Sequence, residues 1–200
     1  SSFSPVNREY IDLSGHVTAA DFSGNLNYWS ISGTVTDSLG PMENVIVNLT
    51  GDSTVQKITD GLGMFTFSDL QAGGTYTITP TKEYWTFSPV ERNYEDIGSS
   101  TSSADFTGAQ NLCSISGNIN DGSNPVENVI LDLSGDSTAQ TITDISGDFI
   151  ITGLAGGGTY TITPSKHHWT FEPVERTFSP LESDTDTVIF TGTLDRWSIS

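Results

Sequence analysis

Apolar and polar residues alternate with a period of two along most of this chain, a pattern typical of β-strands with one buried face. In residues 44–50, Val45, Val47 and Leu49 fall on one face and Ile46 falls on the other. No stretch shows a convincing helical period. The pattern predicts strands near residues 29–36, 44–50, 54–59, 63–68, 75–80, 84–88 and 102–107, with a weaker one near 90–97.

The whole pattern recurs with a period of 84 residues. Residues 29–112 and 113–196 are identical at 43 of 84 aligned positions, which makes them two copies of one module. Residues 1–28 match the last third of that module, and residues 197–200 match its first four positions. We therefore expect the C-terminal third of a preceding module at 1–28, β-sandwich repeats at 29–112 and 113–196, and the start of a following module at 197–200.

The phase of the repeat allows two interpretations. The favoured one is that the 200 residues are a window on a longer tandem array. The alternative is that the incomplete end segment pairs with a neighbouring chain by adding a strand to an open sheet edge.

Tight turns separate the predicted strands. Residues 60–63 (DGLG) and 144–147 (DISG) place Asp at the start of a turn and Gly where a positive φ is expected. Seven or eight short strands in each copy predict an all-β fold, a two-sheet antiparallel sandwich with Greek-key connections.

Residues 30–89 also carry a family resemblance. The matching segments are GTVTD at 33–37, TD at 59–60, GMF at 63–65 and GTY at 74–76, with counterparts TD at 143–144, GDF at 147–149 and GTY at 158–160. This combination resembles the carboxypeptidase-regulatory-like and Cna B-type modules of secreted and surface proteins. The resemblance implies tandem Ig-like, prealbumin-like β-sandwich modules and an extracellular or cell-surface location. It implies no single function, because such modules serve as spacers, stalks and adhesin repeats.

One departure from that family concerns its internal Lys–Asn crosslink between the first and last strands. Residues 29–36 and 113–120 contain no Lys, and the final strand segments SADFTG and TVIFTG contain no Asn. We therefore predict no such crosslink, and we expect Lys82 and Lys166 to be solvated residues at strand ends.

The charge of the chain narrows the set of partners. Seven Lys and Arg against 25 Asp and Glu give a formal net charge of −18, which disfavours nucleic acids and anionic membranes. No run of about 18 apolar residues is present, so no membrane insertion is expected within this segment. The single cysteine, Cys113, is expected to be a small buried hydrophobe.

Catalytic groups do not form a recognisable set. His16, His167 and His168 are not shared between the two copies, and adjacent histidines on a strand would point to opposite faces. The sequence therefore predicts no enzyme and no cofactor. Calcium is the alternative chemistry, because turn aspartates supply hard oxygen ligands, although turn formation explains them without a metal. The candidate calcium ligands are Asp52, Asp60, Asp136 and Asp144.

Aromatic residues raise a carbohydrate-binding alternative. Trp85 and Trp169 occupy the same position in the two copies and are flanked by further aromatic residues. Aromatic side chains on such a strand more often fill a core or a contact between modules. A flat, exposed pair of indoles would favour glycan contact.

The joints between copies carry the main functional indication. Only residues 109–113 separate the segment FTG at 106–108 of one copy from SIS at 114–116 of the next, without a Pro-rich or Gly/Ser-rich run. Apolar residues flank each joint, and we expect them to pack consecutive modules into a stiff rod. These residues are Phe22, Trp29, Phe106, Cys113, Phe190 and Trp197.

These features favour a mechanical function. The sequence predicts an extracellular fibre, stalk or surface filament whose partners are adjacent modules or copies of the same chain. The alternatives are an adhesin or carbohydrate-binding module that contacts a host or matrix surface, and a spacer within a large secreted enzyme.

Overall fold

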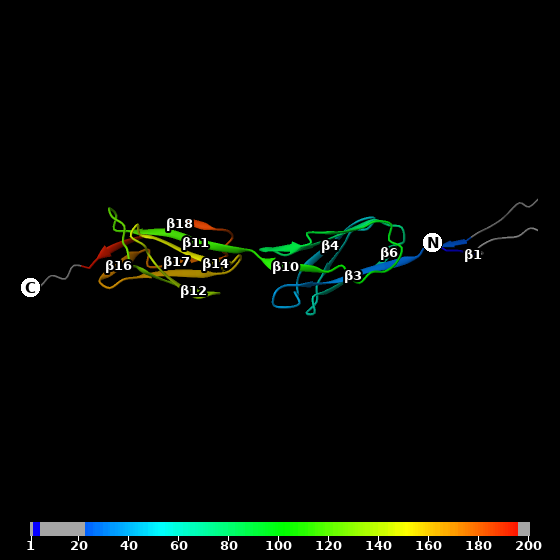
Figure 1. Cartoon of the computed structure of the whole chain (residues 1–200), viewed down its shortest axis with the longest axis horizontal. Helices are drawn as coiled ribbons and strands as arrows, with labels where there is room; N and C mark the ends of the chain where they lie inside the picture. The colour runs from blue at the N-terminus through cyan, green and yellow to red at the C-terminus, as the bar shows by residue number, and fades with distance from the viewer. Residues whose placement is uncertain (1, 5–22, 196–200) are drawn as a thin grey trace, which may run out of the picture. The chain divides into compact units, whose positions relative to one another are not determined.

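A computed structural model describes residues 2–4 and 23–195 of the chain. Contacts within the chain divide it into two compact units, Ser1–Ala109 and Gln110–Ser200 (Figure 1). Every regular element among the described residues is a β-strand. Accordingly, none of the described residues forms a helix that is long and apolar enough to cross a membrane.

The first unit contains a sandwich of two four-stranded sheets, which we call module 1. One sheet has the order β6-β3-β10-β8, and the other has the order β5-β4-β7-β9. The strands are β3 (Tyr28–Thr36), β4 (Ile46–Gly51), β5 (Val55–Ile58), β6 (Met64–Gln71), β7 (Tyr76–Thr81), β8 (Trp85–Ser88), β9 (Arg92–Tyr94) and β10 (Phe106–Gln110).

The second unit repeats this arrangement as module 2. Its sheets have the orders β14-β11-β18-β16 and β13-β12-β15-β17. The strands are β11 (Leu112–Asn120), β12 (Ile130–Gly135), β13 (Ala139–Ile142), β14 (Asp148–Ala155), β15 (Tyr160–Ser165), β16 (Trp169–Glu172), β17 (Arg176–Phe178) and β18 (Thr185–Leu194).

A separate antiparallel pair precedes module 1. It joins β1 (Ser2–Ser4) to β2 (Ser23–Asn25), with Phe3 opposite Gly24. In module 2, β16 and β18 place Phe171 opposite Gly192, and both residues lie 168 positions further on, which is twice the repeat period. The described residues of the N-terminal segment therefore make the same strand pair, in the same register, as the end of a module.

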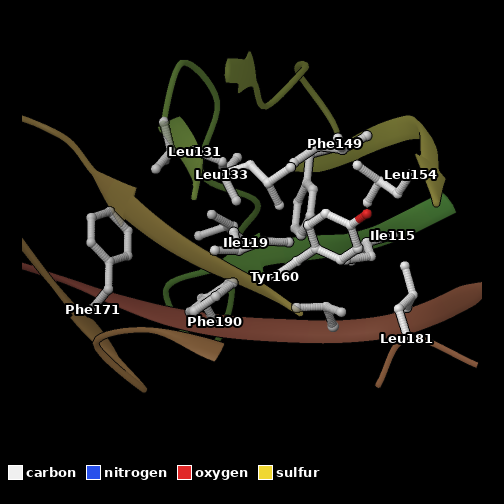
Figure 2. Close-up of a cluster of buried hydrophobic side chains, with 14 of the residues drawn as sticks. Ile115, Ile119, Leu131, Leu133, Phe149, Leu154, Tyr160, Phe171, Leu181 and Phe190 are labelled. Atoms are coloured by element: carbon white, nitrogen blue, oxygen red, sulfur yellow. The ribbon is translucent and has the colours of Figure 1, made fainter. Parts of the chain in front are cut away.

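The alternating pattern is confirmed in β4, whereas the strand predicted at 54–59 forms as β5 without a buried residue. Val45, Val47 and Leu49 have no exposed surface, whereas Ile46 is 37% exposed. Each module has its own apolar core between its two sheets. Figure 2 shows Tyr160, Phe149 and Ile115 packed together in the interior of module 2. Burial of one face of the central strands, such as β4 and β7, is therefore what holds the two sheets together.

The predicted antiparallel sandwich is wrong in one respect. The first and last strands of each module pair in parallel, β3 with β10 and β11 with β18, so one sheet of each module is mixed. A period of two specifies which residues face the core, but not which strand lies alongside or in which direction it runs. The last strand is also shifted, since Phe106–Gln110 replaces the predicted 102–107.

Two local expectations are also corrected. His167 and His168 lie in a turn before β16 rather than on a strand, and their rings meet at 3.6 Å with an interplanar angle of 82°. Lys82 and Lys166 are half-buried at strand ends, and each ammonium group donates to a backbone carbonyl 39 residues away, on Glu43 and Glu127. Each lysine therefore ties the end of a strand to a distant loop.

The predicted Asp turns are confirmed. Gly63 and Gly147 have φ values of +70° and +75°. Their N–H groups donate to the carbonyls of Asp60 and Asp144 at 2.8 and 2.9 Å. Glycine is favoured at both positions because side chains destabilise this left-handed conformation.

Candidate functional site

The side chains predicted at the joints lie within the modules' own interiors. Phe106 and Phe190 belong to the cores of modules 1 and 2, and Cys113 is buried in the core of module 2. Trp29 is half-buried and packs against the core of module 1. Phe22 and Trp197 lie outside the residues whose side chains the structure describes. Burial of the four described side chains is therefore accounted for by their own module.

A different set of apolar residues is exposed at the strand ends beside the joints. Leu26, Tyr28, Leu112 and Leu194 are between 51% and 65% exposed. Leu26 and Leu194 occupy the same position of the repeat, as do Tyr28 and Leu112. The sequence reasoning missed these residues, although their recurrence at the period of the repeat could have indicated them.

The backbone at each joint is hydrogen-bonded to the module that follows it. Strand β10 ends at Gln110 and β11 begins at Leu112, so only Asn111 lies between them. The Asn111 carbonyl accepts a hydrogen bond from the N–H of Gly156 at 2.9 Å. Before module 1, the Asn27 carbonyl accepts from Ala72 N–H at the same distance. The residue before each first strand is therefore tied to the module that follows it.

The indoles of Trp85 and Trp169 are half-buried and pack against their cores. Trp169 stacks on Phe171 with ring centroids 6.5 Å apart and an interplanar angle of 17°, and the Lys166 ammonium lies 5.5 Å from the indole centroid. Contacts within the protein therefore use much of each ring. Beside Trp85 lies a shallow hollow of about 280 Å³, lined by Pro80, Thr81, Lys82, Trp85, Thr86, Phe87 and Val90.

The candidate calcium ligands are engaged with the backbone. Oδ1 of Asp60 accepts from the N–H groups of Leu62 and Met64, both at 2.9 Å. The Asp144 carboxylate makes the matching pair of bonds in module 2. Oδ2 of Asp52 accepts from the N–H of Thr75 at 3.0 Å.

Asp136 repeats the role of Asp52 by accepting from Thr159 N–H at 2.9 Å. In the part of the chain that the structure describes, no three His, Cys, Asp or Glu side chains come together in a geometry that could hold a metal ion. Asp60 and Asp144 therefore close turns, whereas Asp52 and Asp136 each bind a backbone N–H group 23 residues further along the chain. Calcium binding stays a prediction.

The Cys113 thiol lies beside the joint. Burial raises its pKa above the usual value of a thiol, and the Asp184 carboxylate adds to the rise. Oδ1 of Asp184 accepts hydrogen bonds from the N–H and the hydroxyl of Ser114 at 2.7 and 3.0 Å. The thiol is therefore kept neutral and unreactive as a nucleophile.

These features define an Ig-like β-sandwich repeat protein, with two copies of one sandwich in tandem. No protein-family model matches the chain. Chitinase ChiA of Flavobacterium johnsoniae is 29% identical over 158 residues, which cover 78% of this chain and 10% of that enzyme. The chain thus spans about a tenth of the length of this curated relative.

One of the similar solved structures shows the same fold. The Bacillus anthracis TIE protein superposes with a TM-score of 0.70 at 11% identity, covering 84% of this chain and 34% of that one. The shaft pilin SpaA from Lactobacillus rhamnosus GG gives a TM-score of 0.38 at 10% identity, covering 86% of this chain and all of that one. The likeness to the TIE protein supports the sandwich architecture alone.

Proposed function

We propose that this chain is a non-catalytic structural repeat of an extracellular or cell-surface protein, related to the carboxypeptidase-regulatory-like and Cna B-type modules. Its role is to build a fibre, stalk or surface filament from sandwiches that pack on adjacent modules or on copies of the same chain. The observation that carries the proposal is the joint at Asn111, where one residue separates the last strand of module 1 from the first strand of module 2.

Short joints of this kind restrict relative motion. A flexible linker needs several residues without fixed hydrogen bonds, whereas the Asn111 carbonyl is already bonded to Gly156. Exposed apolar residues at the strand ends, such as Tyr28 and Leu112, supply surface that a neighbouring module can bury. A net charge of −18 keeps a long array soluble.

The test is a distance distribution between the modules. Spin labels are attached at E91C and E175C, which are exposed and occupy equivalent positions of the two modules, in a Cys113→Ala background. The distance between the two labels is measured by pulsed electron–electron double resonance. The control carries six Gly and Ser residues inserted after Asn111. We expect a narrow distribution that the insertion broadens. If the unmodified chain is as broad as the control, the joint is flexible and the proposal fails.

A second candidate function is an appendage of a secreted polysaccharide-degrading enzyme. The similarity to Chitinase ChiA over most of this chain favours it, and the hollow beside Trp85 offers a place for a sugar ring. Retention on chitin, with W85A and W169A as variants and L39A as the control, tests this candidate, because Leu39 is 95% exposed and lies outside the lining of the hollow. Retention that is lost in the tryptophan variants and kept in L39A would favour the appendage over the fibre.

A further inference from the structure

The first and last strands of each module form a parallel pair. In module 2, β11 and β18 lie side by side, with Gly117 opposite Val188 and Ile119 opposite Phe190 (Figure 1). In module 1, β3 and β10 place Val35 opposite Phe106. The chain enters each module at the N-terminal end of the first strand and leaves at the C-terminal end of the last. Parallel pairing therefore puts these two points at opposite ends of the same ladder.

This topology decides how a stretching force acts on the module. When the two ends are pulled apart, the first strand is drawn one way and the last strand the other, along their common axis. The hydrogen bonds between them are then strained together rather than opened one after another. A pair pulled from one end would instead peel, with each bond broken in turn.

Backbone bonds extend the contact beyond the paired strands in module 1. The N–H groups of Ser32 and Ala104 donate to the carbonyls of Thr101 and Ser32 at 2.9 and 3.1 Å, and Thr101 N–H donates to the Ser30 carbonyl at 3.0 Å. The first strand is thus bonded to the last segment before β10 begins.

A carboxylate reinforces the pair in each module. Oδ1 of Asp184 accepts from the N–H and hydroxyl of Ser114, near the start of β11. In module 1, Oδ1 of Asp105 accepts from the N–H and hydroxyl of Thr34 at 2.8 and 2.9 Å, near the end of β3. Bonds to an ionised acceptor are stronger than neutral ones. The two positions are not equivalent in the repeat, since Ile189 stands at the position of Asp105 and Ser100 at that of Asp184.

A glycine brings the strands close together in both copies. A Cβ atom at Gly117 would overlap the carbonyl of Val188, and one at Gly33 would overlap the carbonyl of Ala104. Neither glycine has a positive φ, so close approach of the neighbouring backbone explains its presence.

We propose that the parallel pair of first and last strands is a mechanical clamp, and that each module resists tension applied through its two ends. The proposal rests on the structural role proposed above, because a fibre, stalk or filament is what would put the module under tension. The clamp itself consists of the ladder, the carboxylate at Asp105 or Asp184, and the close approach at Gly33 or Gly117.

The test compares two pulling directions in single-molecule force spectroscopy. Handles at the two chain ends load both modules in shear. Handles at the N-terminus and at E182C, in a Cys113→Ala background, keep module 1 in shear but pull β11 and β18 apart from the same end. Under end-to-end pulling, each 84-residue module that unfolds contributes about 280 Å of chain at roughly 3.3 Å per residue. With the handle at E182C, only residues 113–182 of module 2 are under load and contribute about 230 Å, so the two events can be told apart. We expect one of the two unfolding events to fall several-fold in force in the second geometry.

Variants then assign the clamp to its residues. D184A should lower the rupture force of one event under end-to-end pulling, and D105A should lower the other. Thr143→Val, which weakens module 2 away from this strand pair, is the control and should lower the force less than D184A does. Equal forces in the two pulling directions would overturn the proposal. Equal forces would not affect the proposal of a stiff joint, which the distance distribution tests. A broad distance distribution would refute the stiff joint but would not affect the clamp.

Discussion

Substitution of Thr143 by valine should destabilise module 2 alone. Thr143 is 3% exposed, and its hydroxyl donates to the Val126 carbonyl at 2.8 Å and accepts from the Val129 N–H at 2.9 Å. Valine has nearly the same shape but can make neither bond. The hydroxyl holds the loop before β12 against the end of β13. Its loss leaves the Val126 carbonyl and the Val129 N–H unpaired in the interior.

The magnitude follows from those two groups. Leaving a buried donor or acceptor unpaired costs about 1–3 kcal/mol each, and the extra methyl group of valine returns about 0.8 kcal/mol. The two groups together cost about 2–6 kcal/mol, so the expected net loss in free energy of unfolding is about 1–5 kcal/mol. Thr143→Ser keeps both hydrogen bonds and loses only a methyl group, so it should cost about 1 kcal/mol.

A urea titration followed by amide NMR signals resolves the two modules. Ile162 and Ile78 are buried at equivalent positions and report modules 2 and 1. With a urea slope of roughly 2 kcal/mol/M, the Ile162 midpoint should fall by about 0.5–2.5 M in Thr143→Val while the Ile78 midpoint stays in place. Thr59→Val should reverse this result, because Thr59 makes the same two bonds to Met42 and Val45. If valine and serine at position 143 have equal effects, the hydrogen bonds do not stabilise the module as argued.

Three further predictions concern single groups. Because burial raises the pKa of Cys113, its contribution to stability is full below pH 9.0 and is lost as the pH rises above that value. A pH series of urea titrations should therefore show a steeper alkaline loss in the native chain than in Cys113→Ala, and equal slopes would contradict the shift. The indole Nε1 of Trp29 is buried and has no hydrogen-bond partner. Trp29→Phe should change the free energy of unfolding by less than about 1 kcal/mol, because the loss of buried apolar area is offset by removal of an unpaired donor. A loss above about 3 kcal/mol would show that the indole nitrogen is hydrogen-bonded in solution. Calcium or EDTA should leave the thermal midpoint unchanged, because the Asp60 and Asp144 carboxylates already bind backbone N–H groups; a rise with calcium that Asp144→Asn abolishes would restore the metal site.

Much of the fold was predictable because burial acts on one residue at a time. Alternation identified the buried face of β4, and the Asp-to-Gly spacing at 60–63 identified a turn whose glycine has a positive φ. Both signals are local. Any strand with Val45, Val47 and Leu49 on one face must bury that face, whatever its partner.

The rest depended on partners distant in sequence. Thr143 would suit a solvated strand end, and only the folded loop brings the Val126 carbonyl to it. The Lys82 ammonium was expected in water, but a carbonyl 39 residues earlier lies within 2.9 Å. The parallel direction of β18 is set by the connection from the opposite sheet, which no alternation of residues encodes. Residues predicted at the joints, such as Phe106, were correctly recognised as apolar, but their burial is provided by their own module.

The parallel pairing of first and last strands also limits how such a module can be combined with other domains. Strand β18 has ten residues and spans roughly 33 Å, so the two ends of module 2 lie at least about that far apart. Insertion of one domain into a loop of another, and circular permutation, both require ends that lie close together. A connection back across this module would need on the order of ten extra residues. The sandwich is therefore suited to duplication in series and poorly suited to insertion, and the number of copies is the property of the array that can change most easily.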